Sequence, residues 1–233
     1  MHLNAKESYD MNHYFNSGFF LDIGANDGIN LSKTHILHMR GWKGACVEAN
    51  PLIFPKLVKN RSCPDVICIN ECLVSKRNSG KKVKFLVSDG SSLSSGIIPD
   101  DNFDNKDKFR WGDKVKIDDY CRITKQEYKT IDIVTKSLHE VLEETNCPKV
   151  IEYAKFDIEG AEQEVLSDFC FEEYHFLFLV IELASEKLYE NLCANNFIYV
   201  GREGDDDYFV NKQNPYVSGY IEKPFEYSGG HTK

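Results

Sequence analysis

The sequence predicts an α/β fold built around a mostly parallel β-sheet. Short apolar segments at 19–23, 44–48 and 65–70 alternate with segments of helical character. A longer run at 176–182 is apolar throughout, as is typical of a strand buried on both faces of a sheet. The order strand, helix, strand, helix, strand favours parallel pairing through right-handed crossovers.

The first two helices are predicted from cap and turn residues. Ser32 can cap a helix after the first strand, and Gly41 can end it. Pro51 is expected to open a second helix, which carries Phe54 and Leu57. Each helix would connect two neighbouring parallel strands.

The middle of the chain has a different pattern. Segments 82–87 and 129–134 alternate apolar and polar residues, which predicts two half-exposed strands that pair antiparallel. Between them lies an insertion, 88–128, which begins with a serine-rich stretch and continues with charged residues. A loop this long inside a compact domain is usually either a functional lid or disordered.

The parallel pattern then resumes. Ser137 and Glu140 form a capping box, which begins a helix that ends near Thr145. The remaining predicted elements are a strand at 151–157, a helix at 161–166, the strand at 176–182, a capped helix at 185–195, and strands at 197–200 and 208–210. The last two strands are so close in sequence that they predict a hairpin at one edge of the sheet.

Composition excludes several classes of protein. The chain of 233 residues carries a formal net charge of −9, whereas a general nucleic-acid binder needs a basic surface. No apolar run reaches the roughly 18 residues of a membrane span. The first residues are mixed and polar, without the apolar region of a signal peptide. We therefore expect a cytoplasmic protein without a membrane span.

The cysteines and the domain limits complete this outline. Eight cysteines are spread along the chain without a CxxC pair, so we expect reduced thiols and no structural zinc site. We expect one domain at 18–212, including the insertion 88–128. An N-terminal arm at 1–17 precedes it and a C-terminal tail at 213–233 follows it.

Three groups of residues carry the predicted chemistry, and the first is the turn 22–28. Gly24 and Gly28 allow the backbone of this turn to approach a ligand closely. A glycine-rich turn after a strand is common, and by itself it could be no more than a tight connection.

The second group is Glu48, which lies at the end of the second predicted strand, 26 residues after Asp22. A carboxylate at this position accepts hydrogen bonds from both hydroxyls of a ribose in nucleoside-binding α/β folds. Ligands of such folds lie at the carboxyl ends of the strands. We therefore favour a binding role over that of a surface glutamate.

The third group is the segment 155–162, in which acids follow a buried strand directly. Such carboxylates can orient an ammonium group, act as a base or hold a divalent cation. A preference for acids at a helix N-terminus explains Glu162 well. It explains Asp157 poorly, because Asp157 terminates the strand itself.

Together, these groups resemble the FkbM family of methyltransferases. The resemblance rests on the blocks 20–28, 47–51 and 155–162, which occur in order along nearly the whole chain, from about 18 to 210. A further block at 137–142 resembles the start of a family helix, with serine and histidine substituted. The insertion 88–128 matches nothing in this resemblance.

The resemblance implies a Rossmann-like class I methyltransferase fold, with a seven-stranded sheet whose last strand is inserted antiparallel and with helices on both faces. It also implies S-adenosylmethionine as the methyl donor and a hydroxyl of a sugar, glycan or other small molecule as the acceptor. The cofactor-binding residues implied in this way are Asp22, Gly24, Ala25, Asn26, Asp27 and Gly28 at the methionine part, Glu48, Ala49 and Asn50 around the ribose, Asn70, Glu71 and Cys72 near the adenine, and Asp157 at the transferred methyl.

A hydroxyl nucleophile needs a base to remove its proton. Asp157 is the first candidate and Glu159 the second, with Glu182 behind them, whereas His139 lies in a helix on the far side of the fourth parallel strand. Alternatively, Asp157, Glu159 and a further acid could bind a magnesium-like cation that activates the hydroxyl.

Two other functions share parts of this pattern. A nicotinamide-dependent oxidoreductase would have the same first strand, turn and strand-two acid, but Asn26 replaces the second glycine of its GxGxxG motif. A catalytically inactive methyltransferase-like binding module is disfavoured by the intact Asp22, Gly24, Glu48 and Asp157.

The insertion is expected to shape the acceptor pocket. Phe103, Phe109, Trp111 and Tyr120 are aromatic residues in an otherwise charged stretch, and such rings commonly line ligand pockets. The alternative is a surface excursion whose aromatic residues pack against the core.

Overall fold

A computed structural model gives the fold of the chain, and it describes residues 17–88, 95–101, 103 and 129–215. Most of the expected arm, most of the insertion 88–128 and all but the start of the expected tail lie outside these residues. Of the aromatic residues expected at the acceptor pocket, only Phe103 is described, and it is buried. Phe109, Trp111 and Tyr120 lie outside the described residues.

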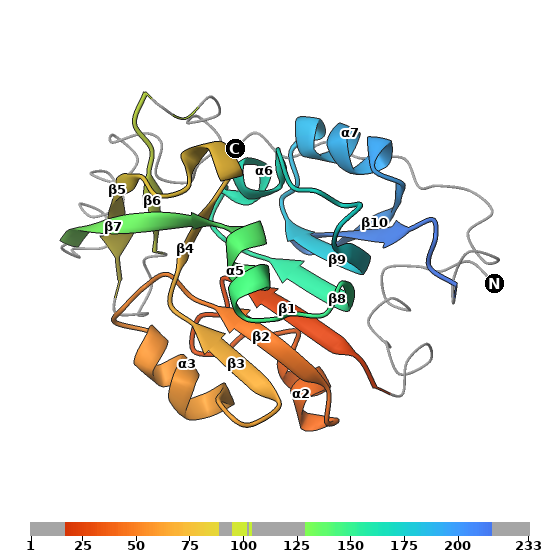
Figure 1. Ribbon diagram of the computed structural model, residues 1–233, viewed down its shortest axis with the longest axis horizontal. Helices are drawn as coiled ribbons and strands as arrows, with labels where there is room; N and C mark the ends of the chain where they lie inside the picture. Colours follow the sequence, from red (N-terminus) through yellow and green to blue (C-terminus); the bar gives the residue numbers. More distant parts are fainter. Residues whose placement is uncertain (1–16, 89–94, 102, 104–128, 216–233) are drawn as a thin grey trace.

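The main sheet has seven strands, in the order β10-β11-β9-β8-β1-β2-β3 (Figure 1). Five of them pair in parallel, and β11 runs antiparallel between β9 and β10. The sheet is therefore mixed, but its parallel part and its antiparallel inserted strand agree with expectation. The strands are β1 (Phe19–Ile23), β2 (Lys43–Val47), β3 (Val66–Ile69), β8 (Val150–Phe156), β9 (His175–Glu182), β10 (Phe197–Glu203) and β11 (Asp206–Asn211).

Apolar clusters cover both faces of the main sheet, although the helices are few and short. One cluster joins Leu37 and Leu57 to the sheet, and the other joins Leu142, Leu166 and Leu188 to it. These leucines belong to helices on opposite faces, as Figure 1 also shows. The helices are α2 (His35–Met39) and α3 (Phe54–Arg61) on one face, and α5 (Leu138–Glu144), α6 (Glu162–Leu166) and α7 (Glu186–Ala194) on the other.

Two of the predicted helix starts are confirmed and two are wrong. Ser137 and Ser185 accept backbone N–H bonds as N-caps, and Ser137 forms the expected capping box. Ser32 is not the cap of α2, although its hydroxyl does accept a bond from the N–H of His35. Pro51 does not open α3 but lies in the turn before it, because Asn50 caps that turn through the N–H of Leu52.

A second sheet of four strands, in the order β4-β7-β5-β6, lies beside the carboxyl end of the first. The antiparallel pairing of β5 (Lys82–Val87) with β7 (Lys129–Ser137) confirms the pattern in the sequence. Two strands of three residues were not expected, namely β4 (Cys72–Val74) and β6 (Gly96–Ile98). A third apolar cluster, which includes Phe85 and Ala161, joins this sheet to the start of α6.

Two further expectations concern membrane-spanning helices and the state of the cysteines. Within the described ranges, no helix is long and apolar enough to cross a membrane. The cysteines in the same ranges are all free thiols, namely Cys46, Cys63, Cys68, Cys72, Cys147, Cys170 and Cys193.

Candidate functional site

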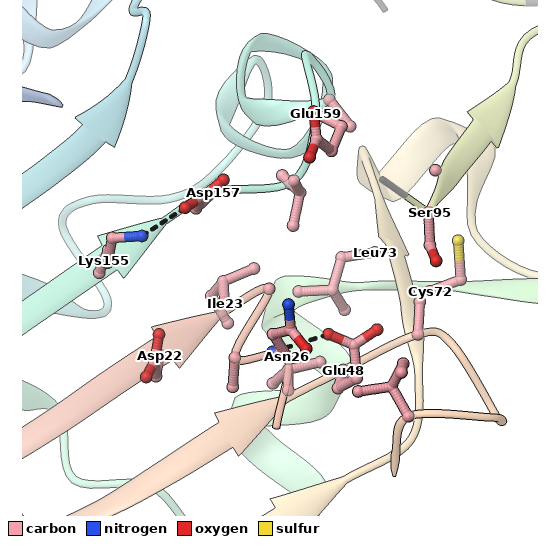
Figure 2. Close-up of a pocket in the computed structure, with 18 of the residues that line it drawn as sticks. Asp22, Ile23, Asn26, Glu48, Cys72, Leu73, Ser95, Lys155, Asp157 and Glu159 are labelled. Carbon is pink, nitrogen blue, oxygen red and sulfur yellow. Dashed lines mark hydrogen bonds and ion pairs between the residues drawn. The ribbon is translucent and has the colours of Figure 1, made fainter. Parts of the chain in front are cut away.

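A cavity of about 520 Å³ lies at the carboxyl ends of β1, β2, β8 and β9 (Figure 2). Its size is ordinary for a small-molecule site, and its place is where ligands bind in parallel α/β sheets. The cavity is lined by ten of the residues implicated by the sequence: Asp22, Gly24, Ala25, Asn26, Glu48, Ala49, Glu71, Cys72, Asp157 and Glu159. The other four, Asp27, Gly28, Asn50 and Asn70, do not line it.

Gly24 fixes where the first turn meets the neighbouring strands. Its φ of +82° favours glycine, and a Cβ atom there would lie 1.8 Å from the carbonyl oxygen of Asp157. The N–H of Gly24 donates to the carbonyl of Val47 at 2.9 Å. The turn is therefore held between the ends of β2 and β8, with its backbone at the cavity wall.

Asp27 and Gly28 shape the same turn without reaching the cavity. The carboxylate of Asp27 accepts the N–H groups of Ile29 and Asn30 at 2.9 and 2.8 Å. Burial raises the pKa of Asp27, but these hydrogen bonds outweigh it and lower the pKa overall. Gly28 has no room for a side chain, since a Cβ atom would lie 2.4 Å from the Cγ of Arg61.

Arg61 is a part of this site that the sequence did not reveal. Its side chain is fully buried, and its guanidinium donates to the carbonyl of Gly28 at 2.8 Å and to the hydroxyl of Thr34 at 3.0 Å. Thr34 in turn donates to Asp22 at 2.5 Å. A buried arginine thus ties α3 to the turn and to the carboxylate that ends β1. No local signal distinguishes it from the surface cations of a helix.

Glu48 is a buried carboxylate at the floor of the cavity. One oxygen accepts the backbone N–H of Asn26 at 2.9 Å (Figure 2), and the other accepts that of Asn50 at 2.7 Å. Each oxygen keeps a second lone pair for a ligand. Burial raises the pKa of Glu48 to about 7, against the opposing effect of these two hydrogen bonds, and the carboxylates of Asp22 and Asp157 raise it further.

Asn50 and Asn70 support the wall rather than form it. The amide of Asn70 donates to the carbonyl of Glu48 at 2.7 Å and thereby holds the end of β2. The amide of Asn50 donates to the carbonyl of Ser88 at 2.6 Å and to the hydroxyl of Ser95 at 2.7 Å. Asn50 therefore connects the main sheet to the end of β5 and to the start of β6.

The far end of the cavity is mostly apolar. Cys72 lines it together with Leu73, Phe85 and Ile97 from the second sheet. Burial raises the pKa of the Cys72 thiol to about 12, so the sulfur is neutral at neutral pH. Glu71 marks the rim, where Lys136 donates to it at 3.0 Å. Walls of this kind favour an uncharged, mostly apolar group.

The near end of the cavity is acidic. Asp157 follows β8 directly, and its Oδ2 accepts a bond from the ammonium of Lys155 at 2.5 Å. Burial raises the pKa of Glu182 to about 9, and the charge of Asp157 beside it acts in the same direction. Glu182 therefore carries a proton at neutral pH. Glu159 also lines this end, from a backbone with φ of +57°.

Glu162 stabilises the turn that presents these acids. Its Oε1 accepts the N–H of Ile158 at 2.7 Å, within the turn between β8 and α6. Burial raises the pKa of Glu162 to about 8, although the hydrogen bond from Ile158 lowers it, and Asp157 and Glu159 raise it further. Glu162 is thus a buried structural acid rather than a simple helix N-terminal charge.

The sequence also left open a divalent cation beside Asp157 and disfavoured His139 as a base. His139 lies away from this cavity, and its Nε2 is 2.5 Å from a carboxylate oxygen of Glu173. In the part of the chain that the structure describes, no three His, Cys, Asp or Glu side chains are arranged to hold a metal ion. One oxygen of Asp157, Oδ2, is paired with the ammonium of Lys155.

Comparison with known proteins identifies a family. The model of the family described as Methyltransferase FkbM domain matches residues 22–209, from the end of β1 into β11. The match includes all three blocks that carry the cavity: the glycine-rich turn, the strand-two acid and the acids after β8. No curated protein matches the chain.

Proposed function

The chain belongs to the FkbM methyltransferase family, and we propose that it transfers a methyl group from S-adenosylmethionine to a hydroxyl of a sugar, glycan or other small molecule. One observation carries the proposal. The glycine-rich turn and Glu48 form adjacent walls of a single cavity, with an apolar pocket beyond Glu48 and acids on the opposite side.

The donor groups of the cavity fit the parts of this cofactor. Glu48 would accept bonds from the two ribose hydroxyls, since each of its oxygens has one lone pair left. The neutral wall around Cys72 and Phe85 would take the adenine. The acids at the other end, which include Asp22 and Asp157, suit a ligand with a positively charged centre.

When bound, S-adenosylmethionine supplies an electrophilic methyl group on a positively charged sulfur. The protein then has to hold an acceptor oxygen in line with that methyl, which accounts for much of the catalysis in such reactions. It also has to remove the proton of the acceptor hydroxyl. Asp157 is the proposed base and Glu159 the second candidate, because both line the acidic end. Glu182 is unsuitable at neutral pH, because its pKa of about 9 leaves it protonated.

Titration of the full chain with the demethylated product, S-adenosylhomocysteine, tests the cofactor. We expect micromolar binding by calorimetry and no binding of NADH. Glu48→Ala is expected to weaken binding by roughly 10- to 100-fold, since charge-assisted hydrogen bonds to two hydroxyls are lost. The control Glu203→Ala alters an exposed acid at the end of β10, and its affinity should equal that of the wild type.

Three results would contradict parts of this proposal. Tight NADH binding without S-adenosylhomocysteine binding would identify a nicotinamide-dependent enzyme instead. Unchanged affinity in Glu48→Ala would remove Glu48 from the cofactor site. Binding of the product without any methyl transfer to components of a cell extract would favour an inactive binding module.

A further inference from the structure

Exposed apolar side chains gather in one stretch of the chain. Of the ten large apolar side chains that are exposed in the described residues, six fall within 29–58, namely Ile29, Leu31, Ile36, Met39, Leu52 and Val58. Leu31, at 97%, and Met39, at 70%, are the most exposed of them. Single exposed apolar residues are normal on a protein, whereas a contiguous group of them marks an interaction site.

The segments that carry these side chains contact one another. They are the turn after β1, the helix α2, and α3 with the turn before it, and both helices cover the same face of the main sheet. The amide of Asn60, in α3, donates to the carbonyl of Asp27 at 2.8 Å. The sulfur of Cys63, just after α3, lies 3.5 Å from Nε2 of His38 in α2. The exposed side chains therefore form one surface, called here the α2–α3 surface, which comprises 29–31, 36–43 and 52–59.

Leu31 is fixed in its exposed position. The N–H groups of Ile29 and Asn30 both donate to Oδ1 of Asp27, at 2.9 and 2.8 Å, and thereby hold the turn. Leu31 has a φ of +57°, which is unfavourable for a residue with a large side chain. A leucine that is held exposed at the cost of backbone strain indicates a partner that buries it.

The α2–α3 surface is basic, although the chain as a whole has a net charge of −9. From 28 to 64 the one acid is Glu48, which is buried at the floor of the cavity. The exposed cations of this stretch are Arg40, Lys43, Lys56 and Lys59. Two acids flank it: Asp27, whose carboxylate holds the turn, and Asp65, which lies 3.4 Å from Lys43. Because exposed ion pairs contribute little, the surface keeps an excess of positive charge.

Exposed aliphatic side chains beside lysines and arginines match the surface of an anionic membrane. Aliphatic side chains can enter the boundary between lipid headgroups and acyl chains, while the cations attract negative headgroups. We propose that the α2–α3 surface docks the protein onto membranes that contain anionic lipids. This inference goes beyond the proposed function and does not depend on it, because it uses none of the groups assigned to the cofactor.

The side-chain types favour a membrane over a nucleic acid. Nucleic-acid sites commonly add aromatic side chains to their cations, whereas the six exposed apolar side chains of this surface are aliphatic or methionine. The acidic remainder of the chain would be repelled by an anionic membrane, so its charge determines which face docks. Leu31 also lines the cavity, and docking would therefore bring the mouth of the cavity to the lipid headgroups.

Co-sedimentation of the full chain with lipid vesicles tests the proposal. One set of vesicles is pure phosphatidylcholine, and the other contains about 30% phosphatidylserine. The wild type should bind the anionic vesicles at least about 10-fold more tightly than the neutral ones, because each cation near the surface contributes about fivefold. Raising the salt from about 0.1 to 0.5 M should weaken this binding, since salt screens exposed charges.

Two variants test the two components of the surface. Lys56→Glu combined with Lys59→Glu should weaken binding to the anionic vesicles by about 10- to 100-fold. The control, Lys187→Glu with Lys212→Glu, changes the net charge equally at exposed lysines elsewhere and should retain binding.

Met39→Ser removes an apolar contact without changing the charge and should weaken binding by about 5- to 10-fold. Its control is Val134→Ser, at a 58% exposed position in β7, which should bind like the wild type. All these side chains are exposed, so the variants should melt like the wild type.

Four outcomes would overturn the proposal. Equal binding of the wild type to both kinds of vesicle would do so. Equal losses in the two double variants would attribute binding to net charge alone. If the wild type ignores the vesicles but binds single-stranded RNA through Lys56 and Lys59, the surface serves a nucleic acid. If it ignores them but forms a dimer that Met39→Ser dissociates, the surface joins two copies of the chain.

Discussion

Asp157 lies between a charged partner and a protonated one. Lys155 donates to one of its oxygens, and Glu182, with a pKa of about 9, supplies a neutral carboxyl beside it. Asp157 thus lies between an ammonium group and a neutral carboxyl at the acidic end of the cavity. This arrangement is consistent with a base that receives a proton from an acceptor hydroxyl.

We predict that Asp157→Asn retains the fold and reduces methyl transfer by about 10²- to 10⁴-fold, the usual contribution of a positioned base. The amide keeps the size of the side chain and can still accept from Lys155, but it cannot take up a proton. The measurement is transfer of labelled methyl from S-adenosylmethionine to a product in a cell extract.

The matched variant Glu159→Gln replaces the other candidate base at the acidic end of the cavity by its amide. A larger loss in Glu159→Gln than in Asp157→Asn would assign the base to Glu159. Full activity in both variants would show that neither carboxylate takes the proton.

At single residues, the sequence located the acids well and their partners poorly. Glu48 and Asp157 each directly follow a strand, and parallel strands bring their ends to one edge of a sheet. Arg61 and Lys155 gave no comparable signal, because their roles depend on Thr34, Gly28 and Asp22. Those contacts form only when distant segments meet.

At the level of elements, the connection from β2 to α3 joins the two sheets. Asn50 is buried there, and its amide donates to Ser88, at the end of β5, and to Ser95, just before β6. Its carbonyl oxygen accepts the N–H of Leu52 at 2.9 Å. One side chain therefore links the second sheet to the strand end that carries Glu48.

We predict that Asn50→Ala lowers the free energy of unfolding by about 1–3 kcal/mol, because buried polar groups lose their partner. The backbone N–H of Asn50 that binds Glu48 is retained, so affinity for S-adenosylhomocysteine should fall less than in Glu48→Ala. Urea unfolding followed by circular dichroism gives the stability.

Asn70→Ala is the matched control, because Asn70 also follows a strand but is exposed. Within the described residues, its side chain bonds only to the carbonyls of Glu48 and Ala49. It should cost no more than about 1 kcal/mol. Equal losses in the two variants would argue against Asn50 as a link between the sheets.

The sequence predicted long elements better than short ones. The apolar run of β9 and the capping box of α5 were strong local signals, and both elements formed as expected. β4 and β6 have three residues each, too few for an alternating pattern to be visible. Pro51 resembled a helix start, but the turn stabilised by Asn50 delays the helix to Phe54.

At the level of the whole molecule, local patterns predicted the α/β class but not the complete order of the strands. The last two strands formed the expected hairpin, yet either of its strands could have joined the sheet, because hairpin pairing is symmetric. The contact of β11 with β9 makes the sheet mixed. The pairing of β11 with β9 agrees with the family resemblance. It could not be predicted from the sequence of the hairpin alone.

The molecule also concentrates buried acids at one edge of its sheet, and this should make its overall stability depend on pH. The pKa values of Glu48, Glu162 and Glu182 are raised to about 7, 8 and 9 from an ordinary value of 4.5. Between the unfolded and folded pKa values, the folded state binds more protons than the unfolded state. The contribution of these three groups to the free energy of unfolding is therefore greatest below about pH 4.5. It is lost as the pH rises towards 9.

We predict that the melting temperature of the ligand-free protein falls between pH 6 and pH 9, and that Glu162→Gln makes this fall smaller. The amide can still accept the N–H of Ile158 but has no charge to bury. At pH 8.5 the variant should be more stable than the wild type by at least about 1 kcal/mol, or about 2–4 °C for a domain of this size. Scanning calorimetry across the pH range gives the comparison, with Glu203→Gln as an exposed control that keeps the wild-type slope. A parallel pH profile in Glu162→Gln and wild type would show that Glu162 does not gain a proton on folding, and that the slope arises elsewhere.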